Sequence, residues 1–242
     1  MSMAESIVPG ALYVVSTPIG NLGDISLRAI HVLRNVDLVA AEDTRTTGRL
    51  LKHLDVSKPL ISFHSHNESR RLPALMSALT GGKSVAVVTD AGTPGISDPA
   101  SSIIREAIGA EIRVIAIPGA SAVLPALVMS GLPMDRFVFE GFLPVKKGRR
   151  TRLQELSTEW RTIVMYESPH RIERTLGDVV SVFGGRRVAL AREITKMFEE
   201  TVRGTAAQVL AHVRGKPVKG ECVLVIEGQR GKEPSQEPAD DR

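Results

Sequence analysis

The stretch SVAVVTDAGTPGISDP, residues 84–99, decides the expected fold class. Apolar residues run from Val85 to Val88 without alternation, which is typical of a strand that is covered on both faces. A loop with two glycines and two aspartates follows, and residues 101–108 then show the apolar spacing of a helix. About two to six residues are enough to join a strand to a helix. The length and charge of this loop therefore indicate a ligand site as well as a connection.

Outward from this stretch, short apolar runs alternate with helical patterns. Strands are expected at residues 11–16, 37–41, 60–64, 84–89 and 113–117. Apolar residues at helical spacing lie between them, at residues 26–36, 44–54, 67–79 and 101–108. This alternation predicts an α/β fold with a parallel or mixed sheet that is covered on both faces.

The turn Pro118-Gly119 ends the first series and places a domain boundary near residue 118. Further strands are expected at residues 137–142, 162–167, 187–191 and 221–228. We therefore expect an N-terminal α/β domain over residues 1–118, a C-terminal α/β domain over residues 119–228, and a disordered polar tail over residues 229–242. Asp98-Pro99 and Ser168-Pro169 each place a capping residue before a proline, which predicts a helix start. A cleft between two α/β domains is a common place for a small-molecule site.

The composition bounds the class of protein. The chain has 242 residues and one cysteine, Cys222, so an internal disulfide is impossible, which fits a reducing cytoplasm. The start, MSMAES, lacks the basic and apolar pattern of a signal segment. The uncharged run Val114–Met134 is interrupted by prolines and glycines, so we interpret it as strand, turn and helix and expect no membrane partner.

Basic residues concentrate in the second half. Residues 1–145 carry a net charge of −1 and residues 146–242 a net charge of +5. The densest part is KKGRRTR, residues 146–152, with five Lys or Arg in seven positions. A charge run is usually a solvated face, but this one follows an aromatic strand and a Leu-Pro turn within the basic half. We therefore expect contacts with the phosphates of an anionic partner.

Asp90 and Asp98 have different expected roles. Asp98 stands where the next helix needs a capping residue. No helix starts directly after Asp90, so we favour contact with a ligand over a purely local turn. Gly92 and Gly95 would let a ligand approach the backbone closely. In open α/β sheets, ligands lie beyond the carboxyl ends of the strands.

Two other strand ends carry similar residues. STPIGNLGDIS, residues 16–26, follows the first strand and would frame the same pocket. In AEDTRTT, residues 41–47, Asp43 is either the N-cap of the next helix or faces the pocket together with Glu42 and Arg45. The sequence has no G-x-G, no P-loop and none of the usual metal-ligand spacings, so standard nucleotide and zinc motifs are excluded.

Nine segments, taken in their order along the chain, resemble those of a known protein family: STPIGNLGDIS, AEDTRTTGRLL, SFHSHNE, VTDAGTPGISDP, PGASA, FVFEGFLPVKKGRR, YESPHRI, REITKMFEE and KGECVLVIEG. Over about residues 11–228 the chain closely resembles the small-subunit ribosomal RNA methyltransferase I family of the tetrapyrrole-methylase superfamily. The resemblance implies two α/β domains of that type, with S-adenosylmethionine in the cleft between them, and a homodimer. It also implies 2′-O-methylation of a cytidine in the decoding region of 16S rRNA, with the small ribosomal subunit as partner.

The resemblance also implies site residues. Cofactor contacts fall on Pro18, Asp90, Gly92, Thr93, Ser121 and Ala122, with Tyr166 and Ala191 as weaker transfers. Ser65 in SFHSHNE stands where an acidic residue is expected, so that loop receives no catalytic role. Contacts with RNA are expected at Lys146, Lys147, Arg149, Arg150, Arg152, His170 and Arg171.

The attacking ribose hydroxyl must lose its proton, and a positioned base could add roughly 10²–10⁴-fold to the rate. The candidates for this base are Asp43, Glu193 and Lys196. Two other functions stay open: C-methylation of a porphyrinogen or corrin precursor on the same fold, and RNA binding by an assembly factor without catalysis. KKGRR argues against the first, and the two intact loops at residues 17–24 and 90–95 argue against the second.

Overall fold

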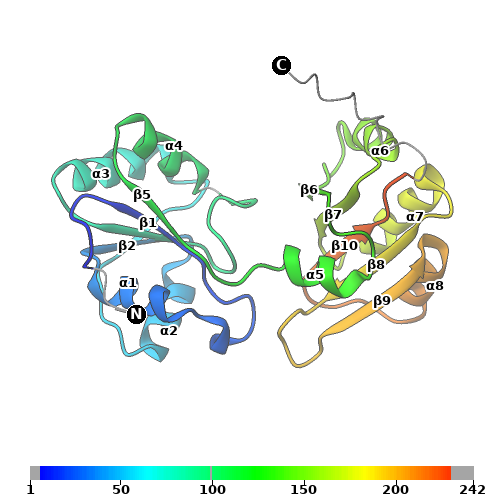
Figure 1. Ribbon diagram of the computed structural model, residues 1–242, viewed down its shortest axis with the longest axis horizontal. Coiled ribbons are helices and arrows are strands. Elements are labelled where there is room, and N and C mark those ends of the chain that lie inside the picture. Colours follow the sequence, from blue (N-terminus) through cyan, green and yellow to red (C-terminus); the bar gives the residue numbers. More distant parts are fainter. Residues whose placement is uncertain (1–5, 99, 230–242) are drawn as a thin grey trace, which may run out of the picture. The chain divides into compact units, whose positions relative to one another are not determined.

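A computed structural model describes residues 6–98 and 100–229 (Figure 1). The chain divides into two compact units, Met1–Ala122 and Val123–Arg242. The division lies slightly after the expected boundary near residue 118, so Ser121 and Ala122 fall in the first unit. Most of the expected tail, residues 230–242, lies outside the described residues.

The first unit contains a parallel sheet with the strand order β3-β2-β4-β1-β5. Its strands are β1 (Leu12–Val15), β2 (Leu38–Ala41), β3 (Leu60–Ser62), β4 (Val85–Val88) and β5 (Val114–Ile117). Its helices are α1 (Leu27–Asn35), α2 (Thr44–His53), α3 (Glu68–Thr80) and α4 (Ser101–Gly109), with a short 3₁₀ turn, η1, at Leu22–Asp24. These elements follow the sequence prediction closely, because each strand is an apolar run and each helix has helical apolar spacing.

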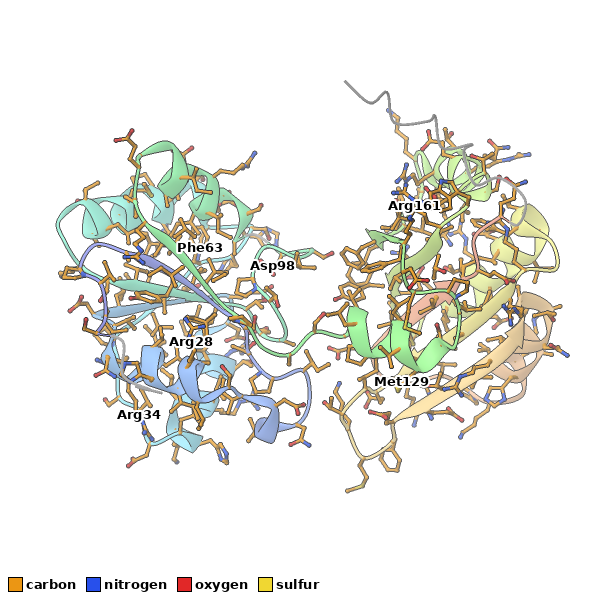
Figure 2. All side chains as sticks on the ribbon, viewed as in Figure 1. Arg28, Arg34, Phe63, Asp98, Met129 and Arg161 are labelled. Atoms are coloured by element: carbon orange, nitrogen blue, oxygen red, sulfur yellow. The ribbon has the colours of Figure 1, made fainter. Side chains whose placement is uncertain are left out.

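Helices cover both faces of this sheet. In Figure 1, α1 and α2 lie on one side and α3 and α4 on the other. Each face has its own core, one with Val32 and Leu51 and the other with Leu75 and Ile103. Phe63 is buried in the second of these cores, and Figure 2 shows it inside the unit. Burial on both faces explains why β1, β2 and β4 are apolar throughout.

The second unit contains a mixed sheet with the strand order β6-β7-β10-β8-β9. Its strands are β6 (Phe137–Phe142), β7 (Thr162–Glu167), β8 (Arg187–Arg192), β9 (Glu200–Thr205) and β10 (Cys222–Ile226). The helices α6 (Arg149–Ser157), α7 (Ile172–Phe183) and α8 (Ala206–Gly215) pack on one face, where Leu153, Leu176 and Val209 join the core. Helix α5 (Val123–Ser130) packs against the same sheet through β8 and β10.

Two details differ from the sequence prediction. Strand β9 was not expected, because ETVRGT is a polar edge strand without a clean apolar alternation. Helix α7 begins at Ile172, whereas Ser168-Pro169 predicted an earlier start. Residues 168–171 instead form a turn, in which the Arg171 N–H donates to the Ser168 carbonyl at 3.0 Å. Within the described residues, no helix is long and apolar enough to cross a membrane.

Candidate functional site

The loops that follow β1 and β4 meet at the carboxyl edge of the first sheet. Thr17 and Gly92 exchange two backbone hydrogen bonds of 2.9 and 3.0 Å. The hydroxyls of Ser16 and Thr93 lie 2.9 Å apart, and the Thr17 hydroxyl donates to the Thr89 carbonyl at 3.0 Å. The expectation that these two loops lie together is therefore confirmed by their own hydrogen bonds.

The loop after β5 joins this edge through a glycine. A Cβ added to Gly119 would lie 2.8 Å from the Ser16 Cβ, which is closer than carbon atoms can approach. Gly92 has a φ of +83°, a conformation that side chains disfavour. Ser121 and Ala122 follow Gly119, and both are partly buried. We call residues 16–18, 89–93 and 119–122 the glycine cradle, because its close approaches require backbone without side chains.

Carboxylates gather beside the glycine cradle, where β2 and β4 end. Glu42 accepts hydrogen bonds from the Thr89 hydroxyl and from the Asp90 N–H, the latter at 3.2 Å. Burial raises the pKa of Asp90, and the nearby charges of Glu42 and Asp43 raise it further. Asp90 is exposed at the strand end, so its carboxylate can accept hydrogen bonds from a ligand.

Asp98 lies on the same long loop after β4 as Asp90, but its contacts are with the backbone of the loop itself (Figure 2). Its carboxylate accepts the N–H groups of Gly95 at 2.7 Å and of Ala100 at 2.9 Å, directly before α4. Burial raises the pKa of Asp98, against the opposing effect of these two donors. Asp98 thus fixes the loop directly before the helix, but the expected N-cap role is wrong, because α4 begins at Ser101 and its N-cap position is Ala100.

Asp43 is the N-cap of α2, since its carboxylate accepts the Arg45 N–H at 2.8 Å. Hydrogen bonds from the Arg45 side chain and backbone lower the pKa of Asp43 to about 2. A carboxylate with so low a pKa is a weak proton acceptor at neutral pH. The capping interpretation therefore holds, and the proposed role of Asp43 as base loses support.

Glu193 and Lys196 form an ion pair of 3.0 Å at the end of β8, and Lys196 also pairs with Glu221 at 3.0 Å. Burial alone would lower the pKa of Lys196, but the two carboxylates outweigh it and the pKa is raised. Burial would likewise raise the pKa of Glu193, yet Lys196 and the Glu221 backbone N–H bring it below its usual value. Lys196 therefore keeps its proton, and neither residue has the pKa of an effective base.

In the second unit, Tyr166 packs between two aromatic rings of β6. Its ring centroid lies 5.0 Å from that of Phe139 in an edge-on arrangement and 5.5 Å from that of Phe142. Phe142 is 52% exposed, so this aromatic cluster reaches the surface. Ala191 is fully buried within β8. As cofactor contacts, Tyr166 and Ala191 stay predictions.

The basic segment, residues 146–152, divides into exposed and buried parts. Lys146, Lys147 and Arg150 are exposed, whereas only 4% of Arg149 is accessible. The Arg149 side chain binds Asp178 and the Thr175 hydroxyl at 2.9 and 2.8 Å. The expectation that Arg149 contacts phosphate is therefore wrong for this structure, since its donors are used inside the fold.

The remaining basic candidates are constrained to different degrees. Arg152 forms ion pairs with Glu140 at 2.5 Å and with Glu155 at 2.9 Å, but it stays 43% exposed. Arg171 pairs with the buried Glu167 at 3.1 Å, and 25% of its side chain is accessible. His170 is exposed on the turn before α7.

Sequence reasoning missed Glu167, which lies at the end of β7 and is 2% exposed. Its carboxylate receives hydrogen bonds or ion pairs from Thr175, Arg171 and Arg149. The available signal was the acid within YESPHRI, at the end of an apolar strand and followed by an arginine. Among the described residues, no group of His, Cys, Asp or Glu is arranged to hold a metal ion.

Comparison with known proteins adds to this geometry. Residues 11–210 match the family described as Tetrapyrrole (Corrin/Porphyrin) Methylases. A ribosomal RNA small subunit methyltransferase I from Streptococcus pyogenes serotype M1 is 46% identical over 228 residues, which are 94% of this chain and 79% of that protein. Another from Synechocystis sp. is 50% identical over 221 residues, 90% of this chain and 79% of that protein.

A solved structure agrees at the level of the fold. A uroporphyrin-III C-methyltransferase from Thermus thermophilus, complexed with S-adenosyl homocysteine, has a TM-score of 0.63 at 14% identity. The match covers 90% of this chain and 97% of that chain. The expected tetrapyrrole-methylase type of α/β fold is thus confirmed.

Proposed function

We propose that this chain, which belongs to the tetrapyrrole methylases and within them to the ribosomal RNA small subunit methyltransferase I family, methylates the ribose 2′-hydroxyl of a cytidine in 16S rRNA. The coarser activity, methyl transfer to ribosomal RNA, follows from the relatives and from the family match. The cytidine, its 2′-oxygen and the decoding region are the finer parts of the proposal.

The cofactor is S-adenosylmethionine, which supplies an activated methyl group on a positively charged sulfur. The chemistry of the glycine cradle fits such a molecule, since three loops converge there with backbone groups and small hydroxyls, brought close by Gly119 and by the positive φ of Gly92. We assign Pro18, Gly92, Thr93, Ser121 and Ala122 to the cradle that holds it. We assign Asp90 to contact with the ribose hydroxyl groups of the cofactor, because its exposed carboxylate lies at a strand end.

The single observation that carries the proposal is the glycine cradle, because RNA binding alone does not need it.

The protein's contribution to the reaction is mainly alignment, which can supply a large part of the acceleration when the attacking oxygen, the methyl carbon and the leaving sulfur are held in line. The depressed pKa of Asp43 and the raised pKa of Lys196 argue against either as the proton acceptor. We therefore give Asp43 a capping role, and the Glu193–Lys196 pair the role of fixing the loop after β8.

The proposed RNA contacts are the exposed cations of the second unit. Lys146, Lys147, Arg150 and His170 are exposed, and Arg152 keeps part of its surface accessible. Phosphate contacts position RNA without reading its sequence, so these residues would orient the substrate. The substrate is proposed to be 16S rRNA within the small ribosomal subunit, and the enzyme to be a cytoplasmic homodimer.

Transfer of a labelled methyl group tests this function. The chain is incubated with labelled S-adenosylmethionine and one of three acceptors: small ribosomal subunits, naked 16S rRNA or a porphyrinogen. Label in either RNA sample supports the proposal, and the ratio of the two identifies the preferred form. Label only in the porphyrinogen would replace the proposal with C-methylation, and label in none would leave an RNA-binding factor.

Calorimetry tests the cradle separately. Gly92→Val adds a branched side chain at a φ of +83°, and Thr93→Arg places a long cation beside Ser16. Both variants should lose measurable cofactor binding while staying folded by circular dichroism. Affinity like that of the native chain in both variants would remove this loop from the cofactor site.

A further inference from the structure

Glu167 occupies an unusual place beside the proposed RNA surface. It ends β7, its side chain is fully buried, and it is surrounded by donors. Thr175 donates its hydroxyl at 2.6 Å, the Ser168 N–H donates at 2.9 Å, and the Arg171 guanidinium lies at 3.1 Å. A buried carboxylate is costly unless it is paired in this way. The proposed reaction gives this residue no direct task.

The arginines around Glu167 hold the loop between β6 and α6. Arg171 donates to the Leu143 carbonyl at 2.6 Å, and Arg149 donates to the Pro144 carbonyl at 3.4 Å. Arg149 also lies 3.9 Å from Glu167, so one buried carboxylate connects both arginines. Two consecutive carbonyls of the loop are thereby tied to the end of the neighbouring strand.

This loop carries the exposed cations. Lys146 and Lys147 follow two residues after Pro144, and Gly148, at a φ of +79°, leads into α6 and Arg150. Val145 is 58% exposed, so this part of the loop lies at the surface. The loop is therefore fixed at its base by buried groups, while its tip stays accessible.

We propose that Glu167 is a positioning residue, which acts through Arg149 and Arg171 to hold Lys146 and Lys147 in the arrangement that RNA phosphates require. The inference rests on the proposed function, because it names how that RNA surface is organised. A loop that is ordered before binding loses less conformational entropy on association, and so binds more tightly. Without its anchor, the same lysines would have to be ordered at the moment of binding, and most of their contribution to affinity would be lost.

A double-mutant cycle tests the connection. Lys146→Ala with Lys147→Ala, Glu167→Gln, and their combination are compared for affinity to small ribosomal subunits. Alone, the lysine change should weaken affinity roughly tenfold and flatten the slope of log K against log salt by about 0.7–0.9 per lost contact. Glu167→Gln should weaken affinity to a similar extent. In the Glu167→Gln background, removing the lysines should cost less than about twofold, since their contribution is already lost.

Kinetics separate positioning from simple destabilisation. Glu167→Gln should raise KM for the ribosomal subunit with little change in kcat, and it should leave cofactor affinity unchanged by calorimetry. Thr175→Val removes one donor to Glu167 and one acceptor for Arg149 while keeping both charges, so it should give a weaker version of the same pattern. The matched control is Glu227→Gln, which breaks the ion pair with Arg187 at the opposite end of the strands in the same sheet. It should leave the slope of log K against log salt equal to that of the native chain.

The outcomes distinguish this inference from the proposed function. Additive losses in the cycle would overturn the positioning role, and so would a fall in thermal stability with unchanged KM and salt slope. If removing both lysines leaves RNA affinity intact, the inference also fails, while methylation of rRNA by the native chain still decides the proposed function. If Glu167→Gln does not fold, Thr175→Val takes its place in the cycle, with the same criteria.

Discussion

The glycine cradle of the first unit differs in its contacts from the Glu167 edge of the second unit, by which we mean Glu167 with Arg149, Arg171 and Thr175. At the cradle, the contacts are made by backbone groups, small hydroxyls and glycines, such as the Thr17–Gly92 pair and the Gly119–Ser16 approach. At the Glu167 edge, the contacts are ion pairs in which the buried Glu167 of β7 meets arginines from α6 and from the turn before α7. The first region should therefore fail by steric change, and the second by loss of charge.

The largest expected effect comes from Arg149. Arg149→Met removes the buried cation that pairs with Asp178 and lies near Glu167, which keeps only Arg171, and this should lower the free energy of unfolding by about 3–5 kcal/mol. Arg152→Met is the matched control on the same helix, because its partly exposed ion pairs should contribute only about 0–1 kcal/mol. Urea denaturation of both variants measures the difference. Equal losses would mean that burial does not separate these two arginines.

A smaller effect is expected from Gly119. In Gly119→Ala, the new Cβ meets the Ser16 Cβ at 2.8 Å, so β1 and the loop after β5 must separate, which should cost about 1–3 kcal/mol. Cofactor affinity should fall with it, since Ser16 also contacts Thr93. Gly177→Ala in α7 is the control, because its Cβ meets nothing within 4 Å and should stabilise the helix by about 0.5–1 kcal/mol. A cradle that tolerates alanine at residue 119 would contradict the steric account.

A pH dependence is expected from Asp90. Burial and the charges of Glu42 and Asp43 raise its pKa, so its ionised form, which accepts hydrogen bonds, is lost at a higher pH than for an ordinary aspartate. Cofactor affinity should therefore decrease as the pH falls through this raised pKa and should be constant above it. Calorimetry across an acidic pH series checks this. Asp90→Asn should bind more weakly at neutral pH and without the acidic decrease, and a parallel decrease in both proteins would assign the effect to another group.

The smallest effect is expected from Asp43. Asn caps a helix about as well as Asp, and the pKa of Asp43, about 2, makes it a poor base. Asp43→Asn should therefore leave the single-turnover rate, measured with saturating cofactor and ribosomal subunits, close to that of the native chain. A loss of about 10²-fold or more, with both affinities unchanged, would instead restore Asp43 as the proton acceptor.

The same contrast explains what the sequence could predict. The elements of the first unit and its loops are local signals, because an apolar run followed by Thr-Pro-Gly residues has few other interpretations. The cap at Asp43 was one of two interpretations for the same reason, since capping depends on the nearest residues, whereas the start of α4 lies two residues later than Asp98-Pro99 predicted. The closeness of Gly119 to Ser16 also depends on the parallel pairing of β1 with β5.

Charges were harder to interpret, because their roles depend on partners far along the chain. Arg149 and Arg150 are neighbours in one basic run, yet the first is buried against residues 167, 175 and 178, and the second is exposed. Lys196 was considered as a neutral amine, but Glu193 and, from a distant segment, Glu221 raise its pKa. Strand β9 was missed because its residues show no clear apolar face.

The most direct test of the central claim is mass spectrometry of nucleosides from 16S rRNA. Small ribosomal subunits that lack the modification are incubated with the chain and S-adenosylmethionine, and the RNA is then digested and sequenced by fragments. The account predicts one new 2′-O-methylcytidine in the decoding region, which is absent when Gly92→Val replaces the native chain. A methyl group on a base, on the ribose of another nucleoside, or at no position in the RNA would contradict it.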